Sequence, residues 1–222
     1  MNWFAAAMAW ITDPAHQSGP DSIGALIGQH LAITGWAALI SVIIGVPLGY
    51  LVGHTGRGRL LVVGASGAAR ALPAIGLLTL VALIVGIGLT APLVALVVLA
   101  VPSAIAGAYS GIDSIDDATL DAARAVGMSP IQVLIRVEIP LGLPQLLGGL
   151  RAAVLQIIAT ATLAAYVGAG GLGVLLFRGL KTQDYAQMLA SAVLIMVLAL
   201  VIDMVFEVAS RLAVKAVRPP PE

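Results

Sequence analysis

Long runs of apolar residues alternate with short polar segments along the whole chain. A helix needs about 20 mostly apolar residues to cross the hydrocarbon core of a bilayer. The pattern predicts an all-α, polytopic membrane protein that forms a single transmembrane domain over residues 1–222. About five transmembrane helices are expected, at 29–53, 73–88, 91–110, 141–166 and 185–210. A shorter helix over 60–71 is expected to precede the second of them.

Composition supports the bilayer as the main solvent. The 222 residues are 60% hydrophobic and 10% charged, whereas soluble domains carry about 25% charged residues. A soluble all-helical protein could not cover so much apolar surface. The net charge of zero gives no indication of a nucleic-acid partner. The apolar stretch Met1–Ile11 has no basic flank, so it is interpreted as a short interfacial helix rather than a signal peptide.

The cations predict the orientation in the cytoplasmic membrane. Three groups fall on one side of a five-span topology, namely Arg57 and Arg59, Arg124 and Arg136, and Arg211, Lys215 and Arg218. Only Arg178 and Lys181 fall on the other side. Because cytoplasmic loops are enriched in Lys and Arg, we expect the N-terminus outside and the C-terminus in the cytoplasm.

The longest polar interruption, 111–138, is therefore expected in the cytoplasm. Asp116 or Asp117 can cap a helix start, and Leu120, Ala123 and Val126 recur at helical spacing. Gly127 suits a left-handed helix end, and Pro130 suits the start of a second short helix. The segment predicts a helix–turn–helix.

Two interpretations of this segment stay open on physical grounds. Ala122, Ala123 and Ala125 lack bulk, so another protein could approach the backbone closely and push on the helix. Alternatively, the segment is an amphipathic helix that rests on lipid headgroups.

The spacing of its residues resembles a known motif. Asp121-Ala-Ala, Gly127 after three residues and Val137-Glu-Ile-Pro140 after nine more resemble the EAA loop of bacterial ABC-importer permeases, E-A-A-x3-G-x9-I-x-L-P. Asp121 replaces the usual Glu and shortens the reach of the carboxylate by one methylene. Val137 and Ile139 replace the usual Ile and Leu.

Further segments are similar to the osmoprotectant branch of that superfamily, which takes up glycine betaine, carnitine or choline. They are 137–144, 160–166, 167–173 and the opening residues 12–14 and 18–21. A permease for another small solute, such as methionine or another amino acid, is the alternative, because that branch shares the loop and the glycine-rich segment.

The resemblance implies a type I ABC importer that works by alternating access. Its ATPase subunits would dock on Asp121, Ala122, Ala123, Gly127 and Pro140, and an extracytoplasmic solute-binding protein would deliver the solute. Because five spans are too few to enclose a gated path, we expect a second permease subunit, identical or homologous. The chain has no G-x4-G-K-[ST] phosphate loop, so ATP hydrolysis would belong to a separate polypeptide.

Polar residues within the predicted spans are candidates for further roles. Gln156 and Thr160 lie one turn apart, as do Thr162 and Tyr166, and such groups line a translocation path or hydrogen-bond to a neighbouring helix. Asp203, Glu207 and Arg211 recur at four-residue spacing. We expect Glu207 and Arg211 to pair, and Asp203 to face protein or water.

Other motifs indicate structure rather than chemistry. Gly168-Ala-Gly170-Gly-Leu-Gly173 matches G-x-G-x-x-G, but a transmembrane run precedes it, so the segment 167–184 is interpreted as a flexible, extracytoplasmic loop beside the translocation path and no cofactor is expected. The three histidines are scattered and predict no metal site. Gly45-x3-Gly49 and Gly107-x3-Gly111 favour close helix packing.

Two rival classes remain. An integral membrane enzyme would need catalytic groups that converge at one depth, and the sequence offers no such set, so no catalytic residue is predicted. A membrane scaffold or channel without a motor would lack the ATPase partner.

Overall fold

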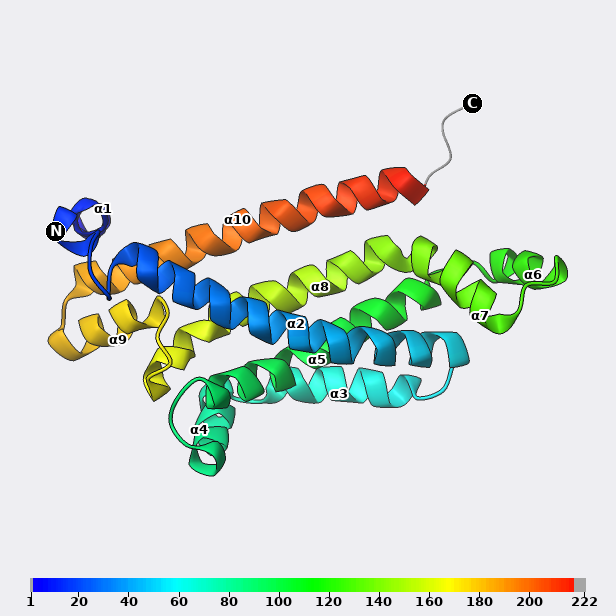
Figure 1. Cartoon of the computed structure of the whole chain (residues 1–222), viewed down its shortest axis with the longest axis horizontal. Helices are drawn as coiled ribbons and strands as arrows, with labels where there is room; N and C mark the ends of the chain where they lie inside the picture. The colour runs from blue at the N-terminus through cyan, green and yellow to red at the C-terminus, as the bar shows by residue number, and fades with distance from the viewer. Residues whose placement is uncertain (1, 218–222) are drawn as a thin grey trace. The chain divides into compact units, whose positions relative to one another are not determined.

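The computed structural model describes residues 2–217 and consists of helices, with no strand among those residues (Figure 1). Five of these residues are described by their backbone alone: Val63, Ala69, Arg70, Ala216 and Val217. Arg218, which was used in the orientation prediction, lies outside the described residues. In chain order the main helices are α1 (Trp3–Thr12), α2 (Ile23–Thr55), α3 (Arg59–Ala71), α4 (Ala74–Val85), α5 (Thr90–Asp113), α6 (Asp117–Ala125), α7 (Pro130–Val133), α8 (Ile139–Ala161), α9 (Gly173–Thr182) and α10 (Tyr185–Val217).

The predicted all-helical membrane fold is confirmed, with a difference in the number of long helices. Within the described residues, four segments are long and apolar enough to cross a membrane: Ile23–Thr55, Thr90–Asp113, Pro130–Val167 and Tyr185–Lys215. Each is longer than the corresponding predicted span. The third is continuous because a π-helical turn, η2 (Leu134–Glu138), joins α7 to α8, and a 3-10 segment, η3 (Thr162–Val167), follows α8.

The remaining predicted span, 73–88, is shorter than expected. Pro73 precedes α4, and Gly86, with φ of 88°, ends it after 12 residues. At 1.5 Å per residue such a helix is about 18 Å long, whereas the hydrocarbon core is about 30 Å thick. The apolar run therefore contains one short helix where the sequence predicted a full span.

The chain divides into two compact units. Within the described residues, the first unit contains residues 2–39, 72–97 and 154–202, and the second contains residues 40–71, 98–153 and 203–217. The four long helices contribute residues to both units.

Glycine-mediated helix contacts build the second unit. A Cβ on Gly45 would lie 2.6 Å from Cβ of Ala104, and one on Gly49 would lie 2.6 Å from Cβ of Ala108, so α2 and α5 are in backbone contact. Gly107 and Gly111 of α5 meet Gly149 and Gly142 of α8 in the same way. Both predicted glycine patterns are thus helix–helix contacts. Small residues permit this approach, which supplies the van der Waals contact that associates helices in lipid.

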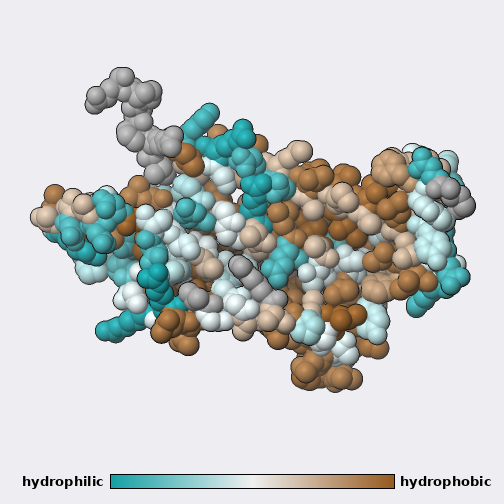
Figure 2. Space-filling view, turned by 180° about the vertical axis from the view of Figure 1, so that it is seen from behind, coloured by the Kyte–Doolittle hydropathy of each residue, from teal (hydrophilic) through white to brown (hydrophobic). Residues whose placement is uncertain are grey.

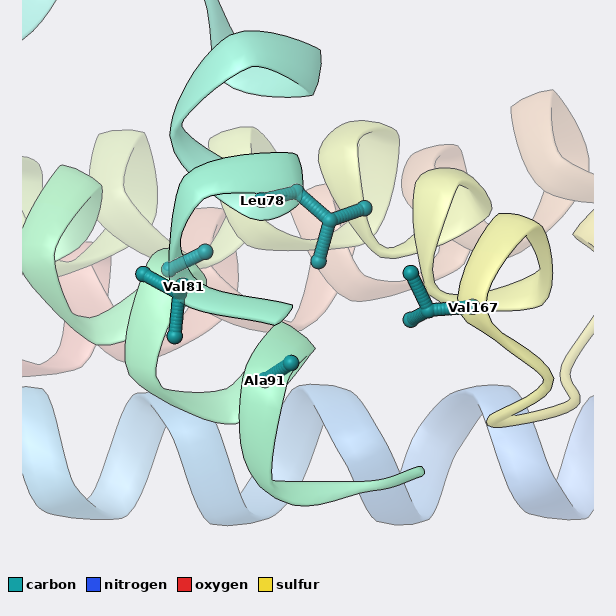
Figure 3. Packing of buried hydrophobic residues seen from close by; sticks show 5 residues of the cluster. Leu78, Val81, Ala91 and Val167 are labelled. Atoms are coloured by element: carbon teal, nitrogen blue, oxygen red, sulfur yellow. The ribbon is translucent and has the colours of Figure 1, made fainter. Parts of the chain in front are cut away.

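Apolar clusters build the first unit. Leu78 and Val81 of α4 pack with Ala91 and Ala95 of α5 and with Val167 at the end of η3 (Figure 3). A second cluster joins Leu26 of α2 with Leu172 and Leu175. These clusters give the glycine-rich segment after η3 a packed environment.

Large apolar side chains remain exposed along the long helices. Figure 2 shows hydrophobic residues over much of the face it presents. On α10 they include Met196, Leu200, Met204, Val208 and Leu212. Such a surface is typical of helices whose solvent is lipid.

Candidate functional site

The hairpin α6–α7 confirms the predicted helix–turn–helix. Asp116 occupies the N-cap position of α6, and Asp117 lies in its first turn, where a carboxylate complements the helix dipole. Pro130 occupies the first turn of α7, as expected. The N–H of Ser129 donates to Oε1 of Gln132 at 2.8 Å and completes the start of α7.

A small apolar cluster holds the two helices together. Leu120 and Ala123 of α6 are buried with Val133 of α7, and Met128 and Val137 pack against them. Ala123 is only 8% exposed and packs inside its own hairpin. Val126 is 77% exposed. The predicted stripe of Leu120, Ala123 and Val126 therefore holds for its first two members only, because the helix ends at Ala125 and Val126 lies beyond the buried face.

The opposite face of α6 is open. Asp121, Ala122 and Ala125 are exposed. Nη1 of Arg124 donates to Oδ1 of Asp121 at 3.0 Å, an exposed pair three residues apart. The exposed face of α6 therefore carries small side chains at the alanines and a charged pair at one edge.

Gly127 makes the turn between the helices. Its φ of 86° lies in the left-handed region, and no heavy atom would come within 4 Å of an added Cβ. Its N–H donates to the carbonyl of Arg124 at 3.0 Å, and that of Met128 donates to the carbonyl of Ala123 at 3.2 Å. Backbone conformation, rather than space, requires glycine here.

Pro140 lies in the first turn of α8 and is exposed. Glu138, two residues before Pro140, makes a contact that the sequence did not predict. Its side chain is 2% exposed and hydrogen-bonded to His54. The sequence contained a weak signal for it, namely an acid inside the motif Val137-Glu-Ile-Pro140.

The candidates for the translocation path lie in the first unit. Gln156 and Thr160 are partly buried and keep their one-turn spacing on α8. Thr162 and Tyr166 lie on η3, where the winding is tighter. Tyr166 is 57% exposed, and its ring centroid lies 5.8 Å from that of Phe177. Their role stays a prediction.

The glycine-rich segment is anchored by side chains from other helices. Gly168, Gly170 and Gly171 have positive φ values. The N–H of Gly171 donates to Oε1 of Gln29 at 3.0 Å, and Oγ of Ser191 donates to the carbonyl of Leu172 at 2.8 Å. These contacts hold the backbone at Gly171 and Leu172, and α9 (Gly173–Thr182) occupies most of the predicted loop 167–184.

A charged network joins α8 to α10 in the second unit. Arg151 donates to Asp203 at 2.6 and 2.7 Å and to Glu207 at 2.6 Å. Arg211 donates to Glu207 at 2.9 Å, which confirms the predicted pair four residues apart. Asp203 faces protein, as expected. Sequence reasoning missed Arg151, whose only signal was a lone cation inside an apolar run.

Comparisons with known proteins agree with this architecture. A family model described as "Binding-protein-dependent transport system inner membrane component" matches residues 45–219. Over 183 residues the chain is 31% identical to the choline transport system permease protein OpuBB of Bacillus subtilis (strain 168), which covers 82% of this chain and 84% of the relative. It is 34% identical over 186 residues to the osmoprotectant import permease protein OsmW of Salmonella typhimurium (82% and 86%).

Solved structures lead to the same group of proteins. An inward-facing form of the MetNI methionine ABC transporter has a TM-score of 0.73 at 27% identity, covering 84% of this chain and 94% of that chain. Permeases of this kind work with ATPase and substrate-binding subunits. The chain thus belongs to the family of binding-protein-dependent transport system inner membrane components and is a permease subunit of an ABC importer.

Proposed function

We propose that this permease subunit translocates a small quaternary-ammonium osmoprotectant, such as glycine betaine, carnitine or choline, across the cytoplasmic membrane by alternating access. The similarity to OpuBB and OsmW, whose names state choline and osmoprotectant transport, supports this solute class. A relative named as a glycine betaine/carnitine/choline permease, OpuCB of Bacillus subtilis (strain 168), is 32% identical over 184 residues.

The exposed face of α6 supports the proposal that ATP hydrolysis is coupled to transport through this helix. Asp121, Ala122 and Ala125 are exposed, while Ala123 anchors the helix to α7. A soluble ATPase can approach the alanines closely and engage Asp121, and the apolar cluster beneath transmits the displacement to α7. Ala123 and Gly127 would support the shape of this surface, whereas Pro140 would act at the start of α8.

The distribution of Lys and Arg along the chain supports the proposed orientation. The hairpin and the C-terminus would face the cytoplasm, where the ATPase subunits are, and the N-terminus would lie outside. A second permease subunit, identical or homologous, would complete the translocation path. Gln156, Thr160, Thr162 and Tyr166 are the candidates to line it, and an extracytoplasmic binding protein would release the solute into it.

Methionine or another amino acid is the second candidate solute. The likeness to the methionine transporter MetNI favours it, at a TM-score of 0.73. Uptake assays distinguish the two classes.

The test uses the chain in proteoliposomes together with a cognate ATPase and a cognate solute-binding protein. ATP-dependent uptake of labelled glycine betaine, carnitine or choline, but not of methionine, is expected. Uptake of methionine but of none of the quaternary-ammonium solutes would show that the chain transports an amino acid instead. Failure of every ATPase to co-purify with the chain would contradict the coupling proposal.

A further inference from the structure

A carboxylate is buried where the hairpin α6–α7 joins the membrane-spanning part of the chain. Glu138 is the last residue of the π-helical turn η2, directly before α8, and its side chain is 2% exposed. A carboxylate taken out of water is unfavourable unless it is paired and hydrogen-bonded. This position therefore needs a specific partner.

His54 is that partner and comes from a distant part of the sequence. It lies in the last turn of α2, and its Nδ1 is hydrogen-bonded to Oε2 of Glu138 at 2.7 Å. The two residues are separated by 84 positions. The bond thus connects the end of α2 to the segment between α7 and α8.

His54 is also next to the hairpin. With Arg124, Met128, Pro130 and Val133 it lines a cavity of about 260 Å³. Met128 and Val133 belong to the apolar cluster that joins α6 to α7. The imidazole is therefore placed between the buried carboxylate and the element that we propose to receive the ATPase.

We propose that the His54–Glu138 pair is a mechanical tie that makes α2 follow the hairpin α6–α7. The tie rests on the proposed coupling function, in which an ATPase displaces the hairpin. The backbone contacts of Gly45 and Gly49 with α5 leave little room for adjustment. A displacement of the end of α2 is consequently passed on to α5 rather than absorbed. His54 and Glu138 are positioning residues that contact no solute.

The transport test separates coupling from folding. The variants are Glu138→Ala, His54→Asn and the exchange His54→Glu/Glu138→His, each assembled with ATPase and binding protein in proteoliposomes. We expect the single variants to retain ATP hydrolysis and to transport about tenfold less solute per ATP. The exchange should recover most of the loss. Arg59→Gln is the matched control, because it removes an exposed ion pair with Asp113 at 3.9 Å in the same unit.

A distance measurement tests the tie without relying on transport. The chain has no cysteine, so spin labels can be placed at Leu51 on α2 and at Ile131 on α7, both of which are exposed. In the parent chain, we expect the distribution of distances between the two labels to stay the same when ATP is added. In Glu138→Ala, we expect the same distribution to change with ATP. A parent distribution that changes with ATP would overturn the tie, as would single variants with parental solute-to-ATP ratios. Absence of uptake by the parent chain would instead count against the proposed function, while the label distances still decide the tie.

Discussion

Arg151 and Asp203, 52 residues apart in sequence, form a two-pronged ion pair between α8 and α10. Nε and Nη2 of the guanidinium donate to the two carboxylate oxygens at 2.6 and 2.7 Å. Glu207 accepts from both Arg151 and Arg211, so two cations balance two carboxylates. Charges within membrane-spanning segments are unfavourable unless they are paired or face water. The network therefore supplies polar contact between two otherwise apolar helices.

Replacement of Arg151 should weaken this junction. In Arg151→Gln the carboxylates of Asp203 and Glu207 lose their shared cation, so we expect a Tm lower by several degrees in detergent. Arg151→Lys keeps the charge but not the two-pronged geometry and should fall between the parent and the Gln variant. The double variant Arg151→Gln/Asp203→Asn should recover part of the loss. Unchanged Tm values for Arg151→Gln would show that the network contributes nothing measurable.

Neighbouring glycines on α8 should respond very differently to a methyl group. A Cβ on Gly149 would collide with the backbone of Gly107, whereas one on Gly148 would meet no heavy atom within 4 Å. Overpacking of this kind destabilises by about 1–3 kcal/mol. We expect Gly149→Ala to lower the free energy of unfolding by that amount, measured by thermal or denaturant unfolding in detergent. Gly148→Ala is the control and should be neutral or slightly stabilising. Equal effects at both sites would contradict the helix contact.

The turn after α6 should tolerate only residues that accept positive φ. Gly127 has φ of 86° and open space around it, so Gly127→Val strains the backbone without a clash. Such strain costs about 1–3 kcal/mol. We expect Gly127→Val to uncouple ATP hydrolysis from uptake in proteoliposomes. Gly127→Asn should remain close to the parent, because Asn accepts the left-handed conformation. Normal uptake by the Val variant would contradict the proposed role of the turn.

Adjacent alanines on α6 should differ in reactivity. Ala122 is exposed and Ala123 is buried, and the cysteine-free sequence allows one thiol to be introduced at a time. We expect Ala122→Cys to react with a membrane-impermeant maleimide in inside-out vesicles and to crosslink to the ATPase in the assembled complex. Ala123→Cys should react at least about tenfold more slowly, because its reaction requires local opening. Labelling of Ala122→Cys from the outside instead would reverse the proposed orientation.

Hydropathy and short motifs were sufficient for the helical membrane fold and for the hairpin. Apolar runs predicted the long helices because a lipid solvent requires continuous apolar surface. Asp117, Gly127 and Pro130 predicted the hairpin because the helix dipole, positive φ and the missing proline N–H act locally. The resemblance of Asp121, Gly127 and Pro140 to the EAA loop predicted the family, and the matching family model confirms it.

Contacts between distant segments could not be predicted in the same way. Nothing in the local sequence pairs His54 with Glu138 or Arg151 with Asp203, since each pair depends on how two helices approach and rotate. The run 73–88 was apolar enough to span, yet Gly86 ends α4 early. Val126 shared the helical spacing of Leu120 and Ala123 but lies outside the buried cluster. Periodicity and capping depend on residues a few positions apart, whereas charge pairing and burial depend on three-dimensional neighbours, so only the folded chain could specify them.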